Sequence, residues 1–126
     1  MNLEIDWEYK PERDNRKFGR ITSDGIRRLF RVPTIPIKIL IDSSRYSGVL
    51  LDISAGGMAI ETSQDLSVDI EGRFIFSLDH YRISVIGRVV NKKDLPGLHR
   101  CGILFLNLDE MASDILKSIF LSKLRR

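Results

Sequence analysis

The first segment with residue types suited to chemistry is the arginine-rich stretch RRLFR. It places Arg27 and Arg31 four residues apart, with Arg28 between them. A guanidinium group binds phosphate oxygens in bidentate fashion and can also stack on the face of a base. Because the two outer arginines are four residues apart on a loop, both can reach one ligand from the same side. The alternative interpretation of this stretch is a solvated basic linker.

The second such segment is the sequence DISAGG, which follows an apolar run. Asp52 supplies an anionic acceptor, and Ser54 offers a hydroxyl to a phosphate or to the backbone of a turn. Gly57 leaves room for a ligand or a backbone to come close, and Gly56 serves the turn, where glycine also permits a positive φ. The alternative is an ordinary tight β-turn in which the carboxylate caps the end of the strand.

The charge of the chain is unevenly distributed. The 126 residues include 20 Lys and Arg against 17 Asp and Glu, which gives a formal net charge of +3. Residues 10–31 alone carry eight basic and three acidic side chains, a net charge of +5. Such local basic density indicates a site for phosphate or for an acidic surface, unless the segment is a solvated basic tail.

Composition excludes several classes of protein. The length indicates one domain, and 43% hydrophobic with 29% charged residues is typical of a globular chain. No apolar run reaches the roughly 20 residues of a membrane helix, and the first residues do not form a secretory signal. The single cysteine, Cys101, excludes an internal disulfide and is typical of a reducing compartment. We therefore expect a cytoplasmic protein without membrane insertion.

Catalytic and metal chemistry find little support in the sequence. His99 and Cys101 lie two residues apart, but no third residue that would orient such a pair is evident. Cys101 is expected to be a small buried apolar residue, and His80 and His99, beside turns, to face solvent. One cysteine and two histidines cannot supply a closed structural zinc site. We expect a binding module rather than an enzyme, with no catalytic residue, no metal and no cofactor.

Hydrophobic periodicity predicts six strands and one helix. Residues 1–32 are expected to form an irregular arm. Apolar alternation then predicts strands over about residues 35–41, 46–53, 58–62, 73–78, 81–90 and 100–106, with a polar loop over 91–97. Met111, Ile115 and Ile119 lie on one face of a C-terminal helix that is expected to pack across a barrel opening. The pattern predicts a small antiparallel barrel or sandwich.

The two segments together, in this order around the first strand, resemble the PilZ domain, the bacterial receptor module for cyclic di-GMP. That family carries an R-x-x-x-R motif, matched here by Arg27 and Arg31. It also carries a D/N-x-S-x-x-G motif on the barrel, matched here by Asp52, Ser54 and Gly57. The later sequences GRVV and GILF are similar to the family's later strands. The resemblance covers about residues 26–126.

The resemblance implies a mainly β fold, a small six-stranded antiparallel PilZ-type β-barrel with a C-terminal α-helix and an irregular N-terminal arm. Residues 1–25 would form the arm and residues 26–126 the PilZ domain, with the barrel over about 33–106 and the helix over about 108–125. The function implied is a cyclic di-GMP-binding effector, in which the ligand orders the arginine loop over the barrel and presents a surface to an unidentified downstream protein. The ligand-binding residues would be Arg27, Arg28, Arg31, Asp52, Ser54, Gly56 and Gly57.

The same resemblance also gives expectations about the guanine edge that Asp52 contacts and the number of ligands per chain, and it leaves alternative functions open. Asp52 suits the N1–H and N2–H₂ edge of a guanine. Ile26 stands where an arginine would favour an intercalated ligand pair, so we expect one ligand per chain in a monomer or weak dimer. One alternative is a nucleotide-independent PilZ-like module for protein interaction. Another is a basic barrel for nucleic acid, given a pI near 9.2. We expect no nucleic acid polymer as a partner, because aromatic and basic residues do not interleave on one sheet face.

Overall fold

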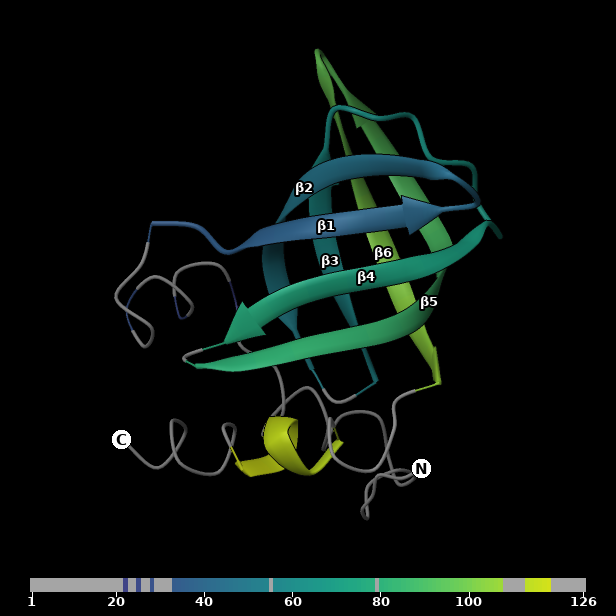
Figure 1. Ribbon diagram of the computed structural model, residues 1–126. Coiled ribbons are helices and arrows are strands. Elements are labelled where there is room, and N and C mark those ends of the chain that lie inside the picture. Colours follow the sequence, from purple (N-terminus) through teal and green to yellow (C-terminus); the bar gives the residue numbers. More distant parts are fainter. Residues whose placement is uncertain are drawn as a thin grey trace.

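The computed structural model is a closed antiparallel β-barrel of six strands (Figure 1). It describes residues 22, 25, 28, 33–54, 56–78, 80–107 and 113–118. Around the barrel the strands follow the order β1-β2-β3-β6-β5-β4, so β1 and β4 lie opposite β3 and β6. The strands are β1 (Pro36–Ile41), β2 (Ser44–Ile53), β3 (Gly57–Thr62), β4 (Glu71–Leu78), β5 (Tyr81–Leu95) and β6 (Leu98–Asn107).

Alternation of apolar and polar residues explains why these segments form strands. In β1 the side chains of Ile37, Ile39 and Ile41 are buried, while the residues between them face outward. The same alternation in β4 buries Phe74 and Phe76. Because the side chains of a strand point alternately to its two faces, each strand supplies one row to the barrel interior. The predicted fold class, a six-stranded antiparallel barrel, is confirmed.

The largest error in the predicted strand boundaries is at the end of β5. The sequence predicted a polar loop over residues 91–97, but β5 continues to Leu95. Its last residue, Leu95, pairs with Leu98, the first residue of β6. The turn is limited to Pro96 and Gly97, and Gly97 has a φ of 78°. Proline followed by a glycine of positive φ is the arrangement of a type II turn. Backbone pairing with β6 thus overrides the polar composition, and the two strands form the long hairpin seen in Figure 1.

Two of the three register shifts in the described barrel, one in β2 and one in β5, set which side chains face outward beside them. In β2, Leu50 pairs with Ile60 and Asp52 pairs with Ala59, so Leu51 is an extra residue. In β5 a similar register shift separates Val89 from Asn91. A bulge reverses the alternation beyond it and re-aims the side chains that follow.

The helical segment of the described chain, residues 113–118, covers one end of the barrel (Figure 1). Leu116 of this segment is fully buried in the hydrophobic core, and Ile115 packs against the core. A helix at the barrel opening is therefore confirmed for these residues. The remainder of the helix predicted over residues 108–125, and almost all of the predicted N-terminal arm, lie outside the described residues. Where the chain is described, no helix has the length and apolarity needed to cross a membrane.

Candidate functional site

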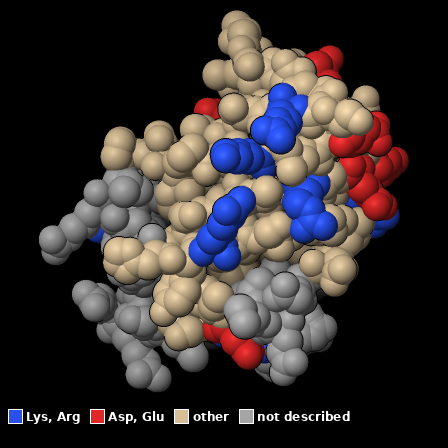
Figure 2. All heavy atoms as spheres, in the orientation of Figure 1, with Lys and Arg blue, Asp and Glu red and all other residues tan. Residues whose placement is uncertain are grey.

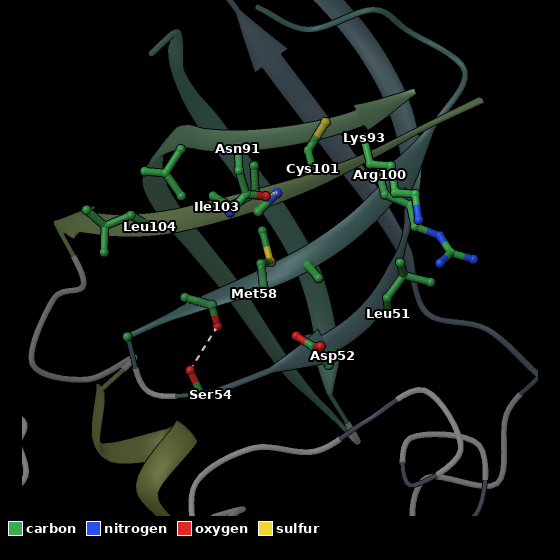
Figure 3. A pocket seen from close by; sticks show the side chains of 15 residues that line it. Leu51, Asp52, Ser54, Met58, Asn91, Lys93, Arg100, Cys101, Ile103 and Leu104 are labelled. Carbon is green, nitrogen blue, oxygen red and sulfur yellow. Dashed lines mark hydrogen bonds between the residues drawn. The ribbon is translucent and has the colours of Figure 1, made fainter. Parts of the chain in front are cut away.

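A hollow of about 440 Å³ lies on the outer surface of β2, β3, β5 and β6. Figure 3 shows its layout. Asp52 and Ser54 lie along one edge and Asn91 along the other, while Leu104 lies at one end. Lys93 and Arg100 lie at the opposite end, beside Leu51. The volume falls within the range of sites for small molecules. Its lining includes four residues predicted for the binding site: Asp52, Ser54, Gly56 and Gly57.

Asp52 reaches the hollow because of the bulge in β2. Leu50 and Ile53 are both buried, although they are three residues apart and would face opposite sides of a regular strand. The extra residue restores the inward orientation at Ile53 and turns Asp52, which is half-buried, toward the outside. The carboxylate therefore stands at the edge of the hollow rather than in the core.

Ser54 organises the turn that follows β2. Its backbone N–H donates to the carbonyl oxygen of Gly57 at 2.9 Å, and its hydroxyl donates to the same oxygen at 3.4 Å. A serine hydroxyl has one proton, so while it donates to the turn it cannot also donate to a phosphate. Of the two predicted roles for Ser54, the one observed is support of the turn.

The two glycines of the turn have different reasons to lack a side chain. A Cβ on Gly57 would lie 2.3 Å from the carbonyl oxygen of Ile103 in β6, so Gly57 permits close approach of two backbones. A Cβ on Gly56 would meet nothing within 4 Å, and its carbonyl oxygen accepts from the N–H of Phe105 at 3.0 Å. Neither has a positive φ, so the turn does not use the conformational freedom that glycine permits there.

The arginine motif is described only in part. Arg28 is exposed, whereas Arg27 and Arg31 lie outside the described residues. The predicted contact of these two arginines with a ligand on the barrel therefore stays a prediction.

Three polar residues of the hollow were not singled out from the sequence. Asn91 accepts a hydrogen bond from the N–H of Gly102 at 3.1 Å, and the bulge in β5 turns it outward. Lys93 is exposed on the same strand, and Arg100 projects from β6. The predicted loop over residues 91–97 concealed Asn91 and Lys93, since only the β pairing places them on this face. The basic residues Lys92, Lys93 and Arg100, close together in the sequence, were the available signal.

Apolar side chains flank the polar ones. Val90 and Leu104 both line the hollow, yet they are 42% and 40% exposed. Exposed apolar residues beside polar groups suit a ligand that has flat apolar faces as well as polar edges.

A second polar cluster ties the hairpin of β5 and β6 to the loop before β4. Lys92 contacts Asp65, and His99 Nδ1 lies 2.6 Å from Asp94 Oδ1. The hydrogen bond from Lys92 lowers the pKa of the Asp65 carboxyl and raises the pKa of Lys92 itself. The prediction that His99 faces solvent was wrong in part, because its side chain is only 19% exposed.

The same cluster resembles a metal-binding set in composition. Ligand atoms of Asp65, Asp94 and His99 lie within 4.8 Å of one another. The ammonium group of Lys92 already contacts Asp65 and lies 3.8 Å from Asp94 Oδ1, so it supplies the positive charge that these carboxylates need. The cluster is therefore interpreted as a network of ion pairs.

Cys101 is buried, with 1% of its surface exposed, as predicted. Burial raises the pKa of its thiol, which keeps the sulfur protonated and a poor nucleophile. This state agrees with the interpretation of Cys101 as a packing residue.

The side of the barrel opposite β3 and β6 carries a separate group of basic side chains. Figure 2 shows them gathered on the face formed by β1, β4 and their neighbours, with acidic side chains at its edge. These exposed residues of β1, β2, β4 and β5 are Lys38, Arg45, Arg73 and Arg82. None of them lines the hollow, so substitutions at these positions are charge-matched controls for substitutions of Lys93 and Arg100.

Comparison with known proteins identifies the family. The PilZ domain model matches residues 14–122, so the chain belongs to the PilZ domain family. The comparison with curated protein sequences finds no match.

Solved structures of the same fold include c-di-GMP complexes and an inhibitor of motility. The crystal structure of YcgR in complex with c-di-GMP from Escherichia coli superposes with a TM-score of 0.67 at 17% identity, over 84% of this chain and 44% of that one. The structure of the Bacillus subtilis inhibitor of motility MotI/DgrA superposes with a TM-score of 0.67 at 15% identity, over 88% of this chain and 52% of that one. The PilZ domain of E. coli YcgR with c-di-GMP superposes with a TM-score of 0.64 at 17% identity, over 84% of this chain and 88% of that one. The chain thus spans about half of the longer relatives.

Proposed function

We propose that this protein is a cyclic di-GMP-binding effector whose ligand occupies the hollow on β2, β3, β5 and β6. The observation that carries the proposal is the convergence of Asp52, Ser54, Gly56 and Gly57 in one hollow of a PilZ barrel. The c-di-GMP complexes of YcgR, which share the fold, support it.

The chemistry of the hollow suits this ligand. Cyclic di-GMP has two guanines with donor-rich edges and two anionic phosphodiesters. The Asp52 carboxylate supplies an acceptor for the N1–H and N2–H₂ groups of one guanine, and the bulge in β2 holds it in place. Gly56 lets the ligand approach the turn, since nothing lies within 4 Å of where its side chain would be. Val90 and Leu104 offer apolar contact to the faces of the bases.

The arginines complete the site in this proposal. Arg27, Arg28 and Arg31 close over the ligand from the N-terminal side and bind its phosphates and guanine edges. Ordering of that segment then presents a new surface to a downstream protein. We place this role in the cytoplasm, since a chain with a single cysteine does not depend on an oxidising compartment for an internal disulfide. Nothing in the proposed role requires catalysis.

Calorimetric titration of point variants tests the assignment. Asp52→Ala and Arg31→Ala are each expected to weaken binding roughly 10- to 150-fold, the effect of losing a hydrogen bond to a charged group. Glu71→Ala is the matched control, because it removes an exposed carboxylate from β4, outside the hollow. Far-ultraviolet circular dichroism verifies that each variant is folded. Wild-type affinity in both Asp52→Ala and Arg31→Ala would refute the site.

A further inference from the structure

Two cations stand directly opposite each other at one end of the hollow. Lys93 of β5 and Arg100 of β6 are register partners in the antiparallel pair, and both line the hollow. Figure 3 shows both side chains at the end of the hollow beside Leu51. Neither belongs to the two sequence motifs. Like charges directly opposite on neighbouring strands repel each other, and an anion bound between them would offset that repulsion.

Only one member of the pair is neutralised within the described structure. Glu61 of β3 is the register partner of Arg100 on its other side, and Arg100 Nε donates to Glu61 Oε2 at 2.7 Å. This bond fixes the guanidinium through Nε and leaves its terminal nitrogens as further donors. Among the described residues, no ion pair joins Lys93 to a carboxylate. The row Glu61, Arg100, Lys93 therefore retains one positive charge at the edge of the hollow.

The bulge in β5 is what brings Lys93 to this face. Beyond the shift between Val89 and Asn91, Lys93 points outward beside the hollow, whereas Lys92 points to the other side and contacts Asp65. The bulges of β2 and β5 thus aim Asp52 and Lys93 at the same hollow from two different strands.

We propose that Lys93 and Arg100 form an anion subsite that receives one phosphodiester of the bound cyclic dinucleotide. Both groups are donors only, so they select an acceptor-rich anion rather than the donor edge of a guanine, which suits Asp52. A phosphodiester between them relieves their mutual repulsion and gains charge-assisted hydrogen bonds. The inference rests on the proposed function and adds to it a phosphate contact supplied by the barrel itself.

Titration with cyclic di-GMP tests the subsite. Lys93→Ala and Arg100→Ala are each expected to weaken binding by about tenfold or more. Lys38→Ala and Arg82→Ala remove the same charges from the other side of the barrel and are expected to change affinity by less than about twofold, since salt screens distant charges. Equal losses in all four variants would overturn the subsite, because they would show an effect of net charge alone.

Stability in urea without ligand provides the second measurement. Lys93→Ala is expected to be as stable as the wild type or more stable, because it removes the repulsion with Arg100. A clear loss of stability would assign Lys93 a structural role and overturn the subsite. Wild-type affinity in both Lys93→Ala and Arg100→Ala would overturn the subsite while the proposed function stands. Failure of the folded wild type to bind cyclic di-GMP would overturn the proposed function, and the subsite with it.

Discussion

Alanine substitutions at Gly56 and Gly57 should separate folding from ligand binding within one turn. The Cβ of Gly57→Ala would lie 2.3 Å from the carbonyl oxygen of Ile103, whereas real Cβ contacts do not fall below 3.0 Å. The strands β3 and β6 would have to move apart by about 0.7 Å where Gly57 pairs with Leu104. Forced overpacking of this kind costs about 1–3 kcal/mol. For a chain of this length we expect a Tm lower by roughly 5–15 °C.

Gly56→Ala is the matched variant, because its Cβ would meet no protein atom within 4 Å. We expect its unfolding free energy to stay within about 0.5 kcal/mol of the wild type, as for other surface substitutions. Its affinity for cyclic di-GMP should nevertheless fall, because the new methyl group stands where the ligand approaches the turn. Thermal and urea unfolding followed by circular dichroism measure the stabilities. Equal stability of Gly57→Ala and wild type would refute the packing argument, and so would equal destabilisation of both variants.

Three further predictions concern the rest of the barrel. Leu116→Ala should destabilise the protein by about 2–5 kcal/mol in urea unfolding, because it empties a fully buried position between helix and barrel. Cys101 should react with a thiol reagent at neutral pH only at the rate at which the protein opens, because it is 1% exposed and burial also raises its pKa; rapid labelling of the folded protein would contradict this. Asp65→Asn should lower stability at neutral pH, and the difference from wild type should vanish in acid. The pKa of Asp65 is lowered by Lys92, so the contribution is present above the unfolded pKa and is lost as the pH falls through the folded one. A difference in stability between Asp65→Asn and the wild type that persists in acid would contradict the pairing of Asp65 with Lys92.

The strands were predictable from the sequence because alternation is a local property. The run from Ile35 to Ile41 shows its period of two without reference to any other segment, and β1 forms there. The extension of β5 to Leu95 was not predictable in the same way. Its polar residues gain their strand conformation from pairing with β6 and from contacts such as that of Lys92 with Asp65, which lie far apart in the sequence.

The candidate site shows the same division. The segment DISAGG can be recognised from the sequence by its residue types and their spacing, and all four of its predicted site residues line one hollow. The sequence does not reveal the bulges at Leu51 and beside Asn91, because a bulge exists only relative to a partner strand. Without the bulges the outward side chains of β2 and β5 are assigned to the wrong faces. Lys93 and Arg100 consequently cannot be recognised as a pair from the sequence, because their pairing depends on the register of β5 and β6.

The most direct test of the central claim is an NMR titration of the ¹⁵N-labelled protein with cyclic di-GMP, with GTP and linear pGpG as controls. The ligand should shift the amide signals of Ser54, Gly56 and Gly57 at the turn and of Gly102 in β6, whose residues line the hollow. Signals of the β1 and β4 face, such as that of Lys38, should stay in place. Absence of shifts at saturating ligand, or shifts confined to the β1 and β4 face, would contradict the account.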